Sequence, residues 1–260
     1  MKKALLLMPL MLFAKVYTVK IEPFMIYHYK AAASGQVVWS KIEKESKSVK
    51  DEQLIKIDDT IDRVNLKSLQ KRAKILQRLI AIAKENLQNA KETYAIKWQN
   101  YQSIKDLKTK SRFEKNLRHS EALLAKQSLL AAKEKLQNLL MQQSDIDVQI
   151  KKLQDLIQKK NPKFSGYIYK IYPTKGDFVG IGAPLVDIAD ITKAKIVLYL
   201  SQEEIENIDK KRLFIDGKPH KLQFYKLQKI TDSNYLTQYK AEIILPAPKI
   251  FGKFIKVEIK

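Results

Sequence analysis

Between Gly35 and Gly166 the chain contains no glycine, and this stretch contains no proline before Pro162. Glycine and proline are the residues that most often end helices and form turns, so the intervening segment is expected to be regular structure. The two glycines lie in similar settings, SGQV at residues 34–37 and SGYI at residues 165–168. This repeat predicts a small β motif written twice, with a long helical insert between the copies. Such a layout is typical of a spacer rather than of an enclosed pocket.

Apolar residues within the insert recur with the spacing of a coiled coil. In the first arm they fall at alternating steps of four and three and resume after a break, at Leu69, Ala73, Leu76, Ile80, Ala83, Leu87, Ala90, Tyr94, Tyr101 and Ile104. In the second arm the series runs through Ala122, Ala125, Leu129, Ala132, Leu136, Leu139, Ile146, Ile150, Leu153 and Ile157, with the polar Gln143 at the one seam position between Leu139 and Ile146. Heptad seams sustained over this length predict two long helices that pack along these positions.

The two seams are out of phase, so a single continuous helix would have to rotate its apolar stripe midway. An antiparallel hairpin avoids this because it folds one seam onto the other. We expect the turn at residues 108–110, since Ser111 and Glu114 form a capping box that starts a new helix. Asp58 or Asp59 is expected to cap the first arm. Arms of about 50 residues would each be roughly 75 Å long.

The hairpin, predicted over residues 58–162 and ended by Asn161 and Pro162, is flanked by two short β-rich segments, 21–57 and 163–190. Three positions repeat with the same spacing in both segments: Val49, Glu52 and Ile55, and Val179, Gly182 and Leu185. Neither segment is large enough to bury its apolar face alone. Together they predict one β-sandwich from which the hairpin emerges.

These features resemble the periplasmic adaptor proteins, also called membrane-fusion proteins of the HlyD type. The resemblance is carried by residues 164–168 (FSGYI), 175–179 (KGDFV) and 182–185 (GAPL), which match the second lipoyl half of that family. It implies an α+β fold: a long antiparallel α-helical coiled-coil hairpin inserted in a split lipoyl/biotinyl-like β-sandwich, followed by a small β-barrel domain. Residues 57–60 (IDDT) hold no lysine where a lipoyl or biotin carrier would present one, so no cofactor is expected.

Residues 191–260 have the pattern of short strands, and the resemblance assigns them to the β-barrel domain. The strand candidates are residues 194–200, 213–215, 221–230, 239–245 and 254–259. A short helix is expected to open at Ser201, and Asp216 with Gly217 marks a turn.

Residues 1–14 predict an export signal. Lys2 and Lys3 precede an apolar run, residues 4–14, which as a helix would be roughly 16 Å long against about 30 Å for a bilayer core. Cleavage after Ala14 would place Leu12 at the −3 position, where a small residue is preferred. An uncleaved membrane anchor is therefore the alternative. The absence of cysteine excludes disulfides and thiol chemistry, and a cysteine-free exported chain suits the bacterial periplasm.

The net charge of +21 comes from basic residues spread along the predicted helices and mixed with glutamate. Together with the export signal, this distribution argues against nucleic acid as a partner and favours attraction to an anionic inner-membrane surface. His28, His119 and His220 lack metal-ligand spacing and are expected to be surface or interface residues. No catalytic triad or phosphate-binding loop can be identified. The sequence therefore predicts neither a metal site nor an enzyme.

The resemblance implies a periplasmic adaptor of a Gram-negative bacterium. Such a protein links an inner-membrane pump, of the ABC or the RND type, to an outer-membrane channel of the TolC type, and several copies form a ring. The alternative is a structural coiled-coil protein of the envelope without a pump partner.

Docking to the channel is expected at the hairpin tip, at Lys108, Thr109, Lys110, Ser111 and Arg112. Family members often carry an Arg, Leu and Ser/Thr set near the tip. Whether Thr109 or Ser111 is aligned with the hydroxyl position, the arginine of that set is missing here. Helix capping is an equally good explanation for Ser111.

Overall fold

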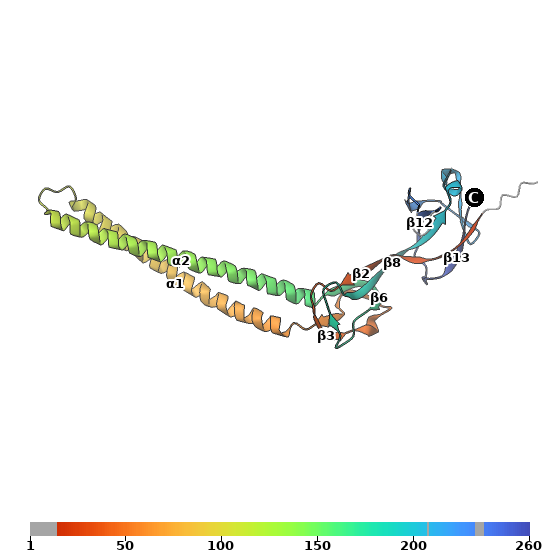
Figure 1. The fold of residues 1–260 in the computed structure, drawn as a ribbon, viewed down its shortest axis with the longest axis horizontal. Coiled ribbons are helices and arrows are strands. Elements are labelled where there is room, and N and C mark those ends of the chain that lie inside the picture. The colour runs from red at the N-terminus through yellow and green to blue at the C-terminus, as the bar shows by residue number, and fades with distance from the viewer. Residues whose placement is uncertain (1–14, 207, 232–236) are drawn as a thin grey trace, which may run out of the picture. The chain divides into compact units, whose positions relative to one another are not determined.

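A computed structural model of the chain describes residues 15–206, 208–231 and 237–260 (Figure 1). The predicted export signal, residues 1–14, lies outside the described residues. Within the described part of the chain, no helix combines the length and the apolar character that crossing a bilayer requires. The structure contains long helices and β-sheets, which confirms the predicted α+β class.

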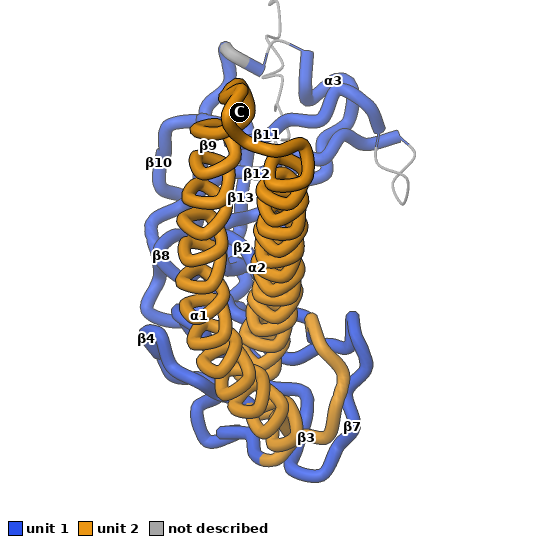
Figure 2. The backbone as a smooth tube through the Cα atoms, turned by 90° about the vertical axis from the view of Figure 1, so that its left-hand side faces the viewer, with its two compact units in different colours: residues 1–31, 39–55, 163–260 blue, residues 32–38, 56–162 orange. Residues whose placement is uncertain are grey.

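The chain divides into two compact units, which Figure 2 colours separately. The helical unit consists of residues 32–38 and 56–162. The β unit consists of residues 1–31, 39–55 and 163–260, of which the first 14 are not described. Segments that precede and follow the helices in the sequence therefore belong to the same unit.

The helical unit is built from two long helices, α1 (Thr60–Ile104) and α2 (Arg112–Lys160), which run side by side in Figures 1 and 2. Seven of their residues are buried: Leu76, Ile80, Ala83, Ala122, Ala125, Leu136 and Leu139. All seven lie at heptad positions of the two predicted seams. The helices pack along those seams because every other face of α1 and α2 is richer in polar residues.

The start of α2 is held by the predicted capping box, which is confirmed. The backbone amide of Glu114 donates to the Ser111 hydroxyl oxygen at 3.1 Å, and the Ser111 amide donates to the Glu114 carboxylate at 3.2 Å. At the start of α1, Asp58 accepts hydrogen bonds from the backbone amide and the hydroxyl of Thr60. Asp59, the other candidate, makes no capping bond.

The larger sheet of the β unit joins strands from before and after the helices. Its strands are β2 (Glu22–Lys30), β4 (Ser48–Gln53), β6 (Lys163–Ile171), β8 (Pro184–Leu200), β11 (Phe224–Leu227) and β12 (Tyr239–Pro246). Their order is β11-β12-β8-β6-β4, and β2 also pairs with β8. β4 and β6 are antiparallel, with Ser48 opposite Tyr167. Strands from the two segments that flank the helices are thus paired in this sheet, and β3 (Gly35–Ser40), β5 (Ile55–Ile57) and β7 (Phe178–Val179) of the same segments form a separate three-stranded sheet of order β5-β3-β7.

A smaller sheet covers one part of the larger one. It has the order β1-β13-β9-β10 and consists of β1 (Val16–Lys20), β9 (Leu213–Ile215), β10 (Lys218–His220) and β13 (Phe254–Ile259). Apolar side chains from both sheets share a core, whose buried members are Ile21, Ala194, Ile196, Leu198, Leu200, Leu213, Ala241, Ile243, Ile255 and Val257. The buried residues of β8 in this core alternate along the strand, as expected when one face is covered.

The closed β-barrel predicted for residues 191–260 is wrong, because the structure forms open sheets there. β8 passes through residue 190 without a break and pairs with β2 and β6 before it pairs with β12. β1, which precedes residue 21, completes the smaller sheet by pairing with β13. The strands of this region are shared with segments outside it, so it does not close on itself.

The remaining elements are short. They are β3 (Gly35–Ser40), the 3-10 turn Ile42–Lys44, β5 (Ile55–Ile57), β7 (Phe178–Val179), α3 (Gln202–Ile205) and the 3-10 turn Ile208–Lys210. α3 opens with a second capping box, in which Ser201 pairs with Glu204. The short helix predicted to open at Ser201 is therefore confirmed.

The internal repeat is visible in how its two glycines are packed. A Cβ added at Gly35 would lie 2.7 Å from Cγ2 of Ile57, and one added at Gly166 would lie 2.6 Å from Cγ2 of Ile188. Each isoleucine follows its glycine by the same number of residues. Only glycine fits either position without moving the isoleucine, so both copies need it for the same reason.

Burial corrects the predicted alignment of the two copies by one residue. The sequence comparison matched Ile55 to Leu185, which would match the buried Leu54 to the exposed Pro184. Counting from the two glycines instead matches Leu54 to Leu185 and Ile55 to Val186, and all four of these side chains are buried. The alignment counted from the two glycines is the correct one, because it matches buried residues of one copy to buried residues of the other.

Candidate functional site

The predicted tip residues, Lys108, Thr109, Lys110, Ser111 and Arg112, are all exposed and lie together at the turn between α1 and α2 (Figure 1). Two of them serve the turn itself. The Ser111 hydroxyl is occupied by the capping box, and Lys110 Nζ donates to the Glu114 carboxylate at 3.2 Å. The hydrogen bond from Lys110, together with that from the Ser111 amide, holds the pKa of Glu114 below its ordinary value. The turn is thus fixed by its own polar groups.

The other three tip residues are available for contacts. Within the described residues, no hydrogen bond or ion pair involves the side chains of Lys108, Thr109 or Arg112. The sequence reasoning missed two further exposed residues beside them. Phe113 is 75 % exposed and Leu107 is 46 % exposed. The sequence could have identified both, because they are large apolar residues that do not fall at the heptad positions of the two seams.

Next to the tip, aromatic side chains replace the aliphatic seam. The rings of Tyr94, Trp98 and Tyr101 follow one another along α1, with centroid distances of 6.2 and 5.6 Å. His119 of α2 stacks on Tyr101 at 4.6 Å, so this histidine is an interface residue between the helices. These contacts join the two helices close to the turn.

An ion pair joins the two helices at the same end. Lys97 of α1 donates to Glu121 of α2 at 3.0 Å, and Arg118 donates to the same carboxylate at 3.2 Å. These two hydrogen bonds lower the pKa of Glu121, with Lys97 making the larger contribution. Because Lys97 and Glu121 lie on different helices, the pair fixes how α1 and α2 face one another near the tip.

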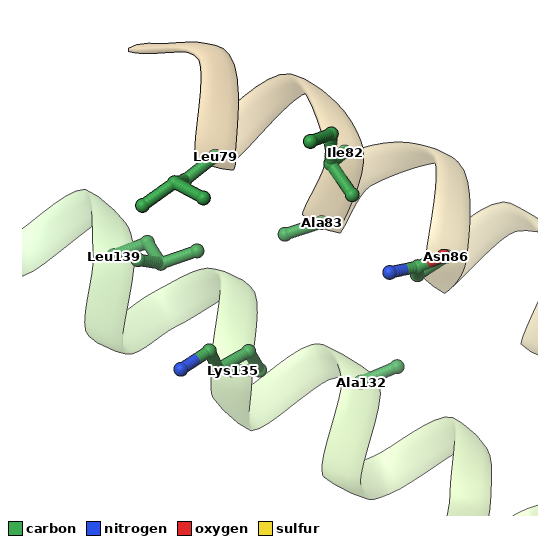
Figure 3. A pocket seen from close by; sticks show the side chains of 7 residues that line it. All are labelled: Leu79, Ile82, Ala83, Asn86, Ala132, Lys135 and Leu139. Carbon is green, nitrogen blue, oxygen red and sulfur yellow. The ribbon is translucent and has the colours of Figure 1, made fainter. Parts of the chain in front are cut away.

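A groove opens between α1 and α2 in their middle part (Figure 3). It has a volume of about 320 Å³ and is lined by Leu79, Ile82, Ala83, Asn86, Ala132, Lys135 and Leu139. Ala83 and Ala132 leave room between the helices because their side chains are small. Leu79 and Ile82 rise beside them and are 46 % and 54 % exposed. The groove is therefore an apolar surface that α1 and α2 themselves do not cover.

In the β unit, His28 has a partner that its sequence context did not predict. Its Nδ1 lies 2.7 Å from Oδ1 of Asp187, and the Tyr172 hydroxyl donates to Oδ2 of the same carboxylate at 2.7 Å. Asp187 is only 5 % exposed. The carboxylate joins β2, β8 and the residue after β6, which indicates a structural brace. Among the described residues, no group of three or more His, Cys, Asp or Glu side chains is placed to hold a metal ion.

No protein-family model matches the chain, and no curated protein matches it in sequence. Solved structures do match it. MacA from Actinobacillus actinomycetemcomitans is 20 % identical, with a TM-score of 0.61 over 95 % of this chain and 78 % of that one. The membrane fusion protein Spr0693 from Streptococcus pneumoniae R6 is 10 % identical, with a TM-score of 0.56 over 94 % of this chain and 98 % of that one.

A chimera of MacA that contains the α-hairpin domain of Pseudomonas aeruginosa MexA is also similar. It is 16 % identical, with a TM-score of 0.50 over 95 % of this chain and 80 % of the chimera. These matches extend over nearly the whole of this chain, so the likeness includes the helical and the β parts. The chain therefore has the fold of a membrane fusion protein, in agreement with the resemblance seen in the sequence.

Proposed function

We propose that the protein is the adaptor subunit of an export system, linking an inner-membrane transporter of the ABC or RND type to an outer-membrane channel of the TolC type. In this proposal residues 58–162 are a coiled-coil hairpin that interrupts a lipoyl-like sandwich built from residues 21–57 and 163–190. The protein acts as a connector in the periplasm of a Gram-negative bacterium. It has no catalytic role, no cofactor and no nucleic-acid partner.

The observation that carries this proposal is the antiparallel pairing of β4 with β6. β4 precedes the helical insert in the sequence and β6 follows it, so the chain that leaves this sheet before the insert returns to it after the insert. α1 has 45 residues and α2 has 49, which corresponds to roughly 70 Å of helix. A stiff arm that is anchored at one end is what a connector across an envelope requires. The likeness to a membrane fusion protein supports the same function.

A conduit needs several copies around it, and the groove of Figure 3 offers a contact between copies. Copies related by rotation about an axis along the hairpin meet at equal heights. Leu130 lies two residues before the groove residue Ala132, and Met141 lies two residues after the groove residue Leu139. Each is therefore on nearly the opposite side of α2 from that groove residue, about 160° away by the shorter way around the helix. Both are more than half exposed. Leu130 and Met141 thus form a ridge at the same height as the groove but on another side of the two helices. If the ridge of one copy enters the groove of the next, the contact is heterologous and can close into a ring.

Cysteine crosslinking tests the proposal directly, because the chain has no cysteine of its own. We expect Thr109→Cys to form a disulfide with a cysteine placed at the periplasmic rim of the outer-membrane channel in living cells. Lys159→Cys is the matched control, since Lys159 is exposed at the opposite end of α2 and should form none. If no tip position yields an adduct, the adaptor proposal is wrong.

A structural coiled-coil protein of the envelope is the second candidate. It is favoured by the fact that the buried residues of α1 and α2 serve to hold the two helices together. A deletion strain distinguishes the candidates. An adaptor predicts increased sensitivity to toxic compounds or a loss of secretion, whereas unchanged sensitivity and secretion would favour the structural protein.

A further inference from the structure

Three large apolar side chains are exposed at the turn end of the hairpin, outside the heptad seams. Leu107 is 46 % exposed, Phe113 is 75 % exposed and Leu117 is 48 % exposed. Phe113 and Leu117 are four residues apart on α2, so their side chains share one face of the helix. None of the three belongs to the core between the helices. An apolar cluster that the fold does not use marks a surface for contact with another molecule.

The backbone that carries Phe113 is held in place before any partner binds. Phe113 is the second residue of α2, directly after Arg112, and the capping box of Ser111 and Glu114 fixes this first turn. Lys110 adds an ion pair to Glu114 at 3.2 Å. A side chain on a fixed turn loses little conformational freedom on binding, which favours its use as an anchor.

The charge around this anchor is positive. Between Lys105 and Arg118 there are six basic side chains and two acidic ones. Both acids are paired with lysines of the same turn, Asp106 with Lys105 at 3.9 Å and Glu114 with Lys110. Within the described residues, Lys108, Arg112 and Lys115 have no ion-pair partner. The charges left unneutralised beside Phe113 are thus all positive.

We propose that the tip docks by placing Phe113 in an apolar recess of a protein partner, and that the surface around this recess is acidic. Lys108, Arg112 and Lys115 then pair with carboxylates of the partner. Aromatic residues and arginine are the side chains that most often dominate binding at interfaces, where a rim of polar contacts excludes water from the anchor. The inference rests on the proposed function, because it takes the partner to be the outer-membrane channel.

A protein fits these features better than a membrane surface does. Helices that bind membranes lie in the interface with a long apolar face and a basic face. Here the apolar cluster covers only the turn and the first two turns of α2. The fixed geometry of Phe113 favours a shaped recess, whereas a bilayer would accept the side chain in any orientation.

Binding of the mature protein to the purified TolC-type channel of the same organism, held in lipid nanodiscs, tests the inference. We expect Phe113→Ser to weaken binding by about tenfold or more, as removal of a central anchor does. Arg112→Glu should weaken binding by about tenfold, and added salt should weaken wild-type binding, because surface charges are screened. Ile96→Ser is the matched control and should stay within about twofold of wild type, since Ile96 is an exposed isoleucine of α1 away from the turn.

The outcomes separate this inference from the proposed function. If wild type binds the channel and Phe113→Ser binds equally well, the anchor is wrong and the adaptor proposal stands. If wild type binds phosphatidylglycerol vesicles through Phe113 but does not bind the channel, the protein partner is wrong. If wild type binds neither, both proposals fail. Circular dichroism should show that all variants keep the wild-type melting temperature, because every substituted side chain is exposed.

Discussion

Asp59, directly before α1, accepts a hydrogen bond of 2.7 Å from the side-chain amide of Asn161, directly after α2. The same carboxylate accepts from Arg63 Nε at 2.7 Å, and Asp59 is only 2 % exposed. Asp62 and Lys160 add an ion pair of 2.7 Å beside it. These contacts join the start of α1 to the end of α2, so the two helices are held together at these ends as well as near the turn.

Asp59→Ala should lower the free energy of unfolding by about 1–3 kcal/mol, because it removes the hydrogen bonds that the buried Asp59 carboxylate accepts from Asn161 and Arg63. Urea unfolding followed by circular dichroism measures this change. Asp155→Ala is the control: Asp155 pairs with Lys159 at 2.6 Å, but both side chains are exposed, so the loss should be within about 0.5 kcal/mol. Equal effects of the two substitutions would contradict the role of Asp59.

The stability that Asp59 contributes should depend on pH. Burial alone would raise the pKa of Asp59, but hydrogen bonds from Asn161 and Arg63 outweigh it and place the pKa below its ordinary value. A lowered pKa in the folded state stabilises the protein above the unfolded pKa of about 3.9, and this stability is lost as pH falls through the folded pKa. The difference in unfolding free energy between wild type and Asp59→Asn should therefore be present at neutral pH and shrink in acid. A difference that stays constant down to about pH 2.5 would rule this out.

Gly166→Ala should destabilise the β unit. The added Cβ would lie 2.6 Å from Ile188 at a backbone φ of 128°, and overpacking together with backbone strain costs about 1–3 kcal/mol. Gly180→Ala is the matched control, since nothing lies within 4 Å of its Cβ position. Thermal unfolding compares the two variants. The close contact would have no energetic importance if both variants melted at the same temperature.

Ring formation through the groove of Figure 3 predicts which surface substitutions block self-association. Leu130→Glu combined with Met141→Glu should shift the protein to monomers, because it places charges on the ridge that would enter the neighbour's groove. Sedimentation velocity measures the distribution of species. Leu124→Glu replaces an exposed leucine about 100° away on α2 and should leave self-association unchanged. Identical distributions for all variants would exclude this ridge.

The helical part of the fold could be predicted because its signals are local. Heptad spacing placed the seven buried residues of α1 and α2, and the capping box at Ser111 marked the start of α2 within one residue. The barrel prediction failed for the opposite reason. The sequence of a short strand does not indicate which strand it pairs with. β8 pairs with β2, β6 and β12, which lie far apart in the sequence.

The candidate site was only partly predictable. The position of the tip followed from the predicted turn and capping box, and the residues chosen, Lys108 to Arg112, were those of the turn itself. Phe113 and Leu107 were missed because exposure depends on what the rest of the fold covers. His119 and His28 looked isolated in the sequence, yet each has a partner on another element.

The sequence by itself determined two long helices, their seams and the break between them, because spacing and capping act over a few residues. Only the tertiary structure decided which of two adjacent aspartates would cap α1 and which would bind Asn161, since the second role needs a partner about 100 residues away. The same holds for β4 and β6, whose pairing closes the β unit across the whole helical insert. The local sequence pattern cannot specify such contacts, because they stabilise the protein only after segments far apart in the sequence have come together.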